Sequence, residues 1–264
     1  LRAVIAIHST HLGPAAGGVR FWHYADPRAA ITDALRLSRG MSYKNAMANL
    51  PMGGGKGVVL AGKQGDVITT AQLEAFGRSV ESLAGKYVTA EDVGMSEERM
   101  KVIATQTRHV SGLPVGEGAA GGDPGPFTAH GIYLGVKAAA KRALGADSMK
   151  DVRVAIQGVG SVGGALARKL AADGAVLTLA DVAGDRAAKL ADELGANLAD
   201  PGEILTLEAD IVSPNALGAI LDEKTIDALQ CKAVAGGANN QLAMRADGAR
   251  LYDRGILYAP DYVI

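Results

Sequence analysis

The stretch VRVAIQGVGSVG, residues 152–163, decides the fold of the second half of the chain. An apolar, β-branched segment runs directly into a G-x-G-x-x-G loop, and a helix-forming segment follows the loop. In such a strand–loop–helix unit the first glycine makes the turn, the second lets the backbone approach a pyrophosphate, and the third packs helix against strand. The motif alone is weak, but this context predicts a dinucleotide site at Gly158, Gly160, Ser161, Val162 and Gly163.

A carboxylate follows where this kind of site needs one. Asp181 closes the next predicted strand, AVLTLAD, 18 residues after Gly163, near the spacing of about 20 expected for the acid that binds the ribose hydroxyls. A carboxylate repels a 2′-phosphate and no arginine follows at once, so the pattern favours NAD over NADP. A glycine turn without a ligand is the alternative interpretation.

Outward from this unit, strands alternate with helices. In the second half we expect helices over 127–144, 162–173 and up to Glu193, and strands at 210–216 and 233–239. This alternation predicts an α/β fold with a Rossmann-type, doubly wound parallel sheet that carries helices on both faces.

The first half reads as a smaller α/β domain. Strands are expected at 1–10, 17–22, 57–62 and 86–90, and helices at 25–50 and 70–83. In the first helix Asp26 is the expected N-cap, Pro27 the first helical residue, and the expected buried face consists of Ile31, Leu35 and Leu37. The segment 112–126 is the richest in Gly and Pro, which predicts a boundary between domains 1–124 and 125–264.

The bulk composition excludes several classes of protein. Lys+Arg 27 against Asp+Glu 28 leaves no basic field for nucleic acid, and no apolar run reaches the ~18 residues of a membrane helix. The single Cys231 excludes a disulfide framework and fits a reducing cytoplasm. The five histidines show no metal-ligand spacing, so we predict no metal. The chain begins at Leu1 and ends in APDYVI, which reads as a strand, so we expect truncation at both ends.

The segment GGGKG, residues 53–57, resembles a phosphate loop only at first sight. A Walker loop needs G-x-x-x-x-G-K-[ST], but Leu50 replaces its first glycine and Gly57 its hydroxyl residue. What remains is Lys56 on glycine backbone that can take positive φ, just before a buried strand. An ammonium held partly dry near a second lysine, Lys44, is disfavoured in its charged form, so its pKa falls toward that of a general base.

Both lysines also have plainer interpretations, a solvated loop lysine for Lys56 and a surface lysine at a helix end for Lys44. At that helix end Lys44 can face a ligand carboxylate as a point charge. Glu91 and Asp92 end a strand that we expect beside the Lys56 strand, where a carboxylate can relay protons. Alternatively, Asp92 caps the helix that starts near Ser96.

Eight blocks carry a resemblance to a known family. In order along the whole chain they are GPAAGGVR, GMSYKNA, LPMGGGKG, TAEDVG, GDPGPFTAHG, QGVGSVG, GGANNQL and YAPDYVI. They resemble the amino-acid dehydrogenases of the Glu/Leu/Phe/Val family. The resemblance implies reversible, NAD(P)-dependent oxidative deamination of an L-amino acid to its 2-oxo acid and ammonium. It also implies a substrate domain in the first half, a nucleotide domain in the second, an active-site cleft between them, and a homo-oligomer.

The resemblance assigns roles to matching positions. Lys44 would bind the substrate carboxylate, helped by the backbone of Gly17 and Gly18. Lys56 would activate water, and Asp92 would handle protons at the substrate nitrogen. In the second half, Asn240 and Asn239 would lie near the amino group and the nicotinamide. Thr128 would lie on the cofactor side.

Ala16 bears on the choice of substrate. Glutamate-specific members of the family resemble K-G-G-x-R where this chain has AGGVR, and their lysine pairs with the side-chain carboxylate. Without that partner a second buried carboxylate is costly, which favours leucine, valine, isoleucine or phenylalanine. Leucine- and phenylalanine-type members often carry Leu there, so Ala16 suggests a roomier pocket that leans toward a bulky or aromatic side chain. Further wall residues are predicted to be Met41, Ala90 and Ser111.

Two other functions stay open at this point. A two-domain NAD dehydrogenase for a hydroxy acid or folate would not need the two lysines and the aspartate together. An NAD-sensing module would use the Gly158 loop for regulation and leave Lys44, Lys56 and Asp92 unexplained. Formation of NADH from an amino acid separates these possibilities.

Overall fold

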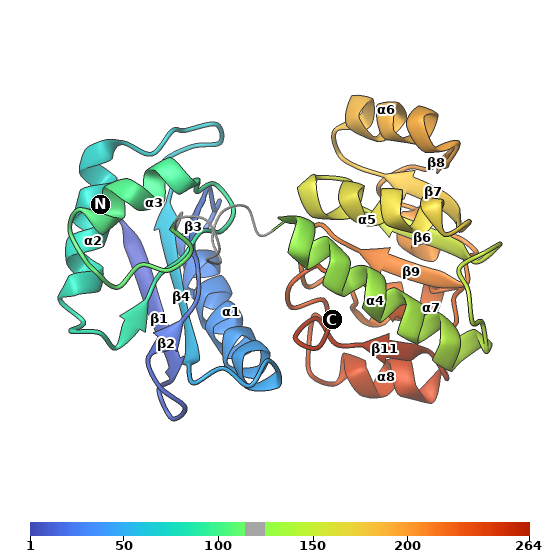
Figure 1. Ribbon diagram of the computed structural model, residues 1–264, viewed down its shortest axis with the longest axis horizontal. Helices are drawn as coiled ribbons and strands as arrows, with labels where there is room; N and C mark the ends of the chain where they lie inside the picture. Colours follow the sequence, from blue (N-terminus) through green and yellow to red (C-terminus); the bar gives the residue numbers. More distant parts are fainter. Residues whose placement is uncertain (114–124) are drawn as a thin grey trace. The chain divides into compact units, whose positions relative to one another are not determined.

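The computed structural model describes residues 1–113 and 125–264, and the chain divides into two compact units, Leu1–Asp123 and Pro124–Ile264 (Figure 1). Each unit has its own sheet and its own hydrophobic clusters. The boundary predicted at 112–126 lies almost entirely outside the described residues. Neither described range contains a helix with the length and hydropathy of a membrane span.

The first unit is built on a mixed sheet in the order β1-β4-β2-β5, with β3 also paired to β4. β1 is antiparallel to β4, and the other pairings are parallel. The strands are β1 (Ala3–Ser9), β2 (Ala15–Ala16), β3 (Val19–Trp22), β4 (Gly53–Leu60) and β5 (Tyr87–Val88). The helices are α1 (Pro27–Met47), α2 (Thr70–Glu81) and α3 (Glu97–Ala104). β4 is thus the central strand, paired with three others.

The predicted start of α1 is confirmed, but of the three residues predicted to mark its buried face only Leu37 is buried. Asp26 is the N-cap and accepts a hydrogen bond from the Arg28 N–H at 2.9 Å, and Pro27 lies in the first turn. Ile31 and Leu35 are 47% and 58% exposed. The buried positions carry mostly small side chains, namely Ala30, Ala34, Leu37, Ser38 and Asn45. Small residues are favoured there because the helix lies very close to the glycines of β4.

The GGGKG segment is part of a strand, and the expectation of positive φ at its glycines is wrong. Gly53–Gly55 lie in β4 with extended backbone. A Cβ added to them in turn would lie 1.9 Å from the Ser9 carbonyl oxygen, 2.2 Å from Ser42 Oγ and 2.6 Å from the Tyr87 ring. The glycines therefore serve close packing from three sides rather than an unusual turn.

Helices cover both faces of this first sheet. Neighbouring residues of a strand point to opposite sides, and in β4 Val59 packs in the cluster that contains Phe76 of α2 and Ile103 of α3. Val58 instead packs with Ala34 of α1. The even-numbered residues of β4, like Val58, therefore lie on the face of the sheet that packs against α1.

The second unit contains a parallel sheet in the order β8-β7-β6-β9-β10-β11. Its strands are β6 (Arg153–Gln157), β7 (Val176–Ala180), β8 (Asn197–Leu198), β9 (Ile211–Pro214), β10 (Ala233–Ala235) and β11 (Leu257–Ala259). Its helices are α4 (Gly125–Leu144), α5 (Ser161–Ala172), α6 (Gly184–Leu194), the 3₁₀ turn η1 (Ile204–Thr206), α7 (Glu223–Ala228) and α8 (Asp247–Asp253). The strand expected in APDYVI is misplaced, because β11 ends at Ala259 and a turn follows.

This sheet is doubly wound, as predicted. Val154 and Ile156 of β6 pack with α4, α5 and α6, while Ala155 between them packs with α7 and α8. The strand order reverses between β6 and β9. Sheets of this kind bind ligands at the carboxyl ends of the strands beside that reversal, which here means the loops after Gln157 and Pro214.

Candidate active site

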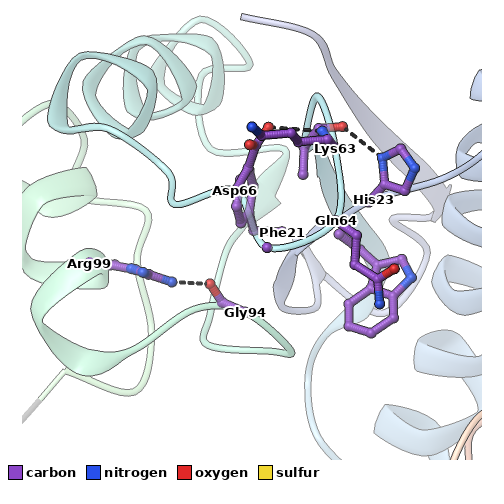
Figure 2. A pocket seen from close by; sticks show the side chains of 10 residues that line it. Phe21, His23, Lys63, Gln64, Asp66, Gly94 and Arg99 are labelled. Carbon is purple, nitrogen blue, oxygen red and sulfur yellow. Dashed lines mark hydrogen bonds between the residues drawn. The ribbon is translucent and has the colours of Figure 1, made fainter.

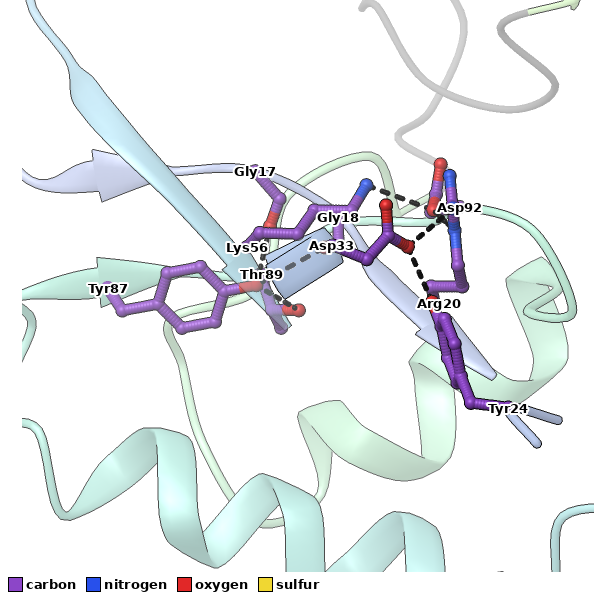
Figure 3. A network of polar contacts seen from close by, with 9 residues as sticks. All are labelled: Gly17, Gly18, Arg20, Tyr24, Asp33, Lys56, Tyr87, Thr89 and Asp92. Carbon is purple, nitrogen blue, oxygen red and sulfur yellow. Dashed lines mark hydrogen bonds and ion pairs between the residues drawn. The ribbon is translucent and has the colours of Figure 1, made fainter. Parts of the chain in front are cut away.

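Lys56 lies in the middle of β4 and is only 4% exposed. It lies two residues before Val58 on the same strand, so its side chain is on the same face of the sheet, the face toward α1. There its Nζ atom lies 2.9 Å from Oδ2 of Asp92 (Figure 3). The two side chains predicted to act in catalysis are in direct contact.

Burial lowers the pKa of the Lys56 amine below its ordinary value, because the charged form loses hydration. The ion pair with Asp92 opposes this shift, and the Arg20 guanidinium adds to it. Arg20 is thus a positive charge beside Lys56 that sequence reasoning did not predict; the contribution expected from Lys44 stays a prediction. A lysine with a lowered pKa can give up its proton and serve as a general base.

Asp92 reaches Lys56 by a route other than the predicted one. Its segment follows β5, which pairs with β2 and not with β4. The Val19 N–H donates to the Ala90 carbonyl oxygen at 2.8 Å and ties this segment to the start of β3. Asp92 is also not the cap of α3, whose N-cap residue is Ser96.

Two cations keep Asp92 ionised. Burial by itself would raise the pKa of this carboxyl, but Lys56 and Arg20 outweigh burial and lower the pKa. An ionised carboxylate in contact with an amine of lowered pKa can exchange a proton with a third group that enters the site.

Sequence reasoning missed the residues behind this pair. Arg20 Nε donates to Asp92 Oδ2 at 3.0 Å, and Arg20 NH1 donates to Asp33 Oδ2 at 2.9 Å (Figure 3). The Tyr24 hydroxyl donates to the same Asp33 oxygen. Arg20 lies on β3 and Asp33 on α1, so no periodic spacing links them; the only signal is the arginine in the block GGVR.

Gly17 and Gly18 link β2 to β3 beside the Lys56–Asp92 pair. The Tyr87 hydroxyl donates to the Gly17 carbonyl oxygen at 2.6 Å, and the Gly57 N–H donates to the Gly18 carbonyl oxygen at 3.1 Å. A Cβ added to Gly18 would lie 2.9 Å from the Asp92 Cβ. Within the described residues the Gly18 N–H has no hydrogen-bond partner, so it is a candidate donor to a ligand.

Lys44 lies in the last turn of α1, where the helix dipole favours a cation. Its side chain is partly buried. Among residues 1–113 and 125–264, none forms an ion pair with its ammonium group. Lys44 is therefore available to an anionic ligand.

The predicted wall residues differ in their surroundings. Met41 Cγ lies 3.1 Å from the position of a Cβ on Gly17, so Met41 borders that backbone. Ala16 ends β2 just before it, and Ala90 is held against β3. Ser111 is exposed. Its N–H donates to the carbonyl oxygen of Thr89, the residue before Ala90, at 2.7 Å. The other three wall residues lie at the Gly17–Gly18 link or at the start of β3.

In the second unit, each glycine of the G-x-G-x-x-G loop has the property that its place in the motif requires. Gly158 has a φ of 84°. A Cβ on Gly160 would meet no heavy atom within 4 Å, whereas a Cβ on Gly163 would lie 1.9 Å from the Gly158 carbonyl oxygen. The open space at Gly160 fits a pyrophosphate, and Ser161 and Val162 begin α5, whose N-terminus offers N–H donors.

Asp181 follows β7 beside this loop, and its carboxylate accepts three hydrogen bonds from its own unit, fewer than the about four that a carboxylate can accept. Oδ2 accepts from the Val159 N–H at 2.8 Å, while Oδ1 accepts from the Ala183 N–H at 2.8 Å and from the Arg186 guanidinium at 2.7 Å. Burial opposes ionisation, but Arg186 and the two N–H groups lower the pKa of Asp181. No arginine follows Asp181 directly in sequence, yet α6 brings one to it in space.

The other predicted cofactor-side residues occupy loops and a helix start of the second unit. Thr128 is exposed near the start of α4. Asn239 and Asn240 follow the carboxyl end of β10, and Asn240 has a φ of 51°, a conformation that asparagine tolerates better than most residues. The Asn240 N–H donates to Asp261 at 2.8 Å.

A separate pocket of about 340 Å³ lies in the first unit (Figure 2). Trp22, Lys63, Asp66 and Arg99 line it, and none of the predicted site residues does. The Lys63 N–H donates to Asp66 at 2.9 Å, and the Arg99 guanidinium donates to a neighbouring backbone carbonyl. The pocket is therefore distinct from the candidate active site.

Neither the histidines nor Cys231 adds to the site. In the part of the chain that the structure describes, no three His, Cys, Asp or Glu side chains are grouped to hold a metal ion. Burial raises the pKa of the Cys231 thiol to about 11, so it stays protonated and a poor nucleophile at neutral pH.

Residues 1–109 match the family model described as "Glu/Leu/Phe/Val dehydrogenase, dimerisation domain". The leucine dehydrogenase of Thermoactinomyces intermedius is 48% identical over 100% of this chain and 72% of the relative. The crystal structure of L-tryptophan dehydrogenase from Nostoc punctiforme matches with a TM-score of 0.75 and 41% identity, covering 99% of this chain and 74% of the other. A hetero-hexameric glutamate dehydrogenase from Thermus thermophilus matches with a TM-score of 0.76 at 25% identity, over 98% and 67% of the two chains.

Proposed function

The chain belongs to the Glu/Leu/Phe/Val family of amino-acid dehydrogenases, and from this premise we propose that it oxidises an apolar L-amino acid reversibly with NAD. The products would be the 2-oxo acid, ammonium, NADH and a proton, at the expense of one water. The observation that carries the proposal is the buried Lys56–Asp92 pair at 2.9 Å.

Lys56 and Asp92 divide the proton chemistry. Lys56, as the free amine, takes a proton from water, and the water oxygen then attacks the carbon of the imino acid that oxidation leaves. Asp92 accepts and returns protons at the substrate nitrogen, so that the nitrogen departs as ammonia. The lowered pKa of Lys56 supports the first role and the ionised state of Asp92 supports the second.

Lys44 and the Gly17–Gly18 backbone bind the substrate carboxylate in this proposal. The Lys44 ammonium supplies a point charge, and the Gly18 N–H supplies a directed hydrogen bond. The fixed Gly17 carbonyl, held by Tyr87 at 2.6 Å, keeps that peptide from turning. Position and electrostatics are what the protein adds to a hydride transfer.

The residues of the second unit fit NAD. The open space at Gly160 and the N-terminus of α5 suit the pyrophosphate, and Asp181 suits the ribose hydroxyls. Thr128 and Asn239 are proposed on the cofactor side, and Asn240 near the amino group. When bound, NAD supplies the acceptor for the hydride from the substrate Cα.

An apolar substrate is supported by Ala16 and by the relatives. Ala16 offers no charge to a side-chain carboxylate, and burial of such a group without a partner is costly. The leucine and L-tryptophan dehydrogenases are both more than 40% identical to this chain, whereas the glutamate dehydrogenase is at 25%. Leucine, valine, isoleucine and phenylalanine are therefore the proposed substrates, with Met41, Ala90 and Ser111 as further walls.

A homo-oligomer is part of the proposal. The family model that matches residues 1–109 is described as a dimerisation domain, and most soluble oligomers are homo-oligomers with closed symmetry. Sedimentation equilibrium of the purified chain measures the assembly directly, and a monomer at micromolar concentration would contradict this part of the proposal.

The function is tested by NADH formation from a panel of L-amino acids, followed by absorbance, with D-leucine and L-glutamate as controls. We expect turnover with at least one of the four apolar L-amino acids and little with either control. Cofactor binding without turnover on any amino acid would instead favour an NAD-sensing module. Equal rates with NADP would overturn the cofactor preference.

The glycine loop gives a matched pair of variants. Gly160→Ala should fold normally and bind NAD about tenfold more weakly, a difference of about 1.4 kcal/mol, because its Cβ enters space that is free of protein atoms. Gly163→Ala should lower stability instead, because its Cβ would lie 1.9 Å from a carbonyl oxygen. Isothermal titration and thermal unfolding distinguish the two effects. An unchanged NAD affinity in Gly160→Ala would place the pyrophosphate elsewhere.

A further inference from the structure

Behind the Lys56–Asp92 pair stands an ion-paired arginine that the reaction chemistry does not itself require. Arg20 reaches Asp92 through Nε at 3.0 Å and Asp33 through NH1 at 2.9 Å (Figure 3). The same Asp92 oxygen, Oδ2, also receives the Lys56 ammonium at 2.9 Å. Two cations thus converge on one carboxylate oxygen.

The network contains as many positive as negative groups, and it is poorly hydrated. The side chain of Arg20 is 11% exposed and that of Asp33 27%. A guanidinium keeps its proton under all ordinary conditions, so Arg20 is a permanent charge beside an amine that must become neutral to act. A buried charge of this kind persists only with partners, and Asp33 gives Arg20 a second carboxylate besides the Asp92 that it shares with Lys56.

We propose that Arg20, anchored by Asp33, is a positioning residue that fixes the Asp92 carboxylate against Lys56 and tunes the proton equilibrium between the two. The proposal rests on the roles proposed above for Lys56 and Asp92. Arg20 does not touch the reacting atoms; it acts through Asp92. Its guanidinium presents donors in a fixed planar arrangement to two carboxylates at once, whereas a lysine ammonium is a compact, freely rotating point charge.

The direction of the tuning follows from charge. Burial is the largest influence on the Lys56 pKa and lowers it, Asp92 raises it, Arg20 lowers it further, and Asp33 raises it. Removal of Arg20 should therefore raise the Lys56 pKa, and removal of the Asp33 charge should lower it. Among the described residues, Tyr24 after β3 and Tyr87 of β5 also interact with the network. Burial first of all raises the pKa of both hydroxyls, which keeps them protonated. Glu91 adjoins Asp92 in sequence.

The test compares pH profiles of kcat/KM for Arg20→Gln, Arg20→Lys and Asp33→Asn in the full chain. The limb on which activity rises with pH should move to higher pH by about one unit in Arg20→Gln and to lower pH in Asp33→Asn. Arg20→Lys keeps the positive charge but loses the planar arrangement of donors. It should therefore lower kcat while the midpoint of the pH profile moves little. Lys101→Gln removes a cation from the exposed Lys101–Glu97 pair and should leave the profile unchanged.

A purely structural role for Arg20 predicts a different result. Activity would then fall by the same factor at every pH, with a lower unfolding midpoint and no shift of the profile, and that outcome overturns the proposal. A second readout does not depend on turnover. The ¹³Cε resonance of Lys56, assigned by its loss in Lys56→Arg, should titrate at higher pH in Arg20→Gln than in wild type. If the wild type oxidises no amino acid, the proposed function fails, while this titration still decides whether Arg20 tunes Lys56.

Discussion

Lys56→Ala should lower kcat for amino-acid oxidation by about 10²–10⁴-fold, the range typical of a lost general base. The side chain is buried against Asp92, and among residues 1–113 and 125–264 no other lysine forms an ion pair with that carboxylate. NAD affinity should stay within about twofold of wild type, because the loop at Gly158 belongs to the second unit. Steady-state kinetics measure kcat, and isothermal titration calorimetry measures the affinity for NAD.

Lys44→Ala is the matched comparison for this variant. A residue that binds the carboxylate in both the ground state and the transition state should raise KM, by about tenfold for 1.4 kcal/mol, and change kcat far less. The remaining activity of Lys56→Ala should also lose the rise with pH that deprotonation of Lys56 produces. Near-normal kcat in Lys56→Ala would refute the role of this lysine, and loss of NAD binding would refute the division of labour between the units.

Gly54→Ala should destabilise the first unit by about 3 kcal/mol or more, the upper part of the range for overpacked sites. Its Cβ would lie 2.2 Å from Ser42 Oγ and 2.3 Å from both the Ser38 carbonyl oxygen and the Ser42 nitrogen. Two of these atoms are backbone of α1, so relief requires the helix to move away from β4. The single tryptophan, Trp22, lies in β3 of the same unit, so its fluorescence during urea unfolding reports the change.

Gly131→Ala is the control for this second prediction. Gly131 lies in α4, and an added Cβ there would meet no heavy atom within 4 Å. In a helix interior this exchange stabilises by about 1 kcal/mol, so the tryptophan transition should not move to lower urea. If Gly54→Ala unfolds at the same urea concentration as wild type, the close contact between α1 and β4 is not a feature of the folded protein.

In the second unit the strands β6, β7, β9 and β10 and the helices α4, α5 and α6 can be predicted from the sequence, whereas β8, α7 and α8 are not predicted and the last strand is misplaced. The predicted strands and helices alternate along the chain, and the spacing of the glycines in the loop at Gly158 indicates the conformation of that loop. The first unit is harder to predict, because β2 and β5 have two residues each. Strands so short carry no periodic pattern, and the pairing of β5 with β2 instead of β4 depends on the whole sheet.

The candidate site shows the same division. Lys56 and Asp92 stand in uncommon sequence blocks, which is enough to single them out as candidates from the sequence alone. The bridge from Arg20 to Asp33 joins a strand to a helix through side chains alone, and Arg186 approaches Asp181 only after a turn of the chain. Such contacts depend on three-dimensional packing, and residue spacing does not encode them.

The packed glycines of β4 also determine how this enzyme can be altered. At positions 53–55 and 57 an added methyl group would lie within 3 Å of a neighbouring atom, so random libraries at these positions will consist largely of misfolded variants. Ala16 and Met41 already carry side chains, and both lie next to the Gly17–Gly18 backbone. Mutagenesis intended to widen the range of accepted amino acids should therefore vary Ala16 and Met41 and leave the glycines of β4 unchanged.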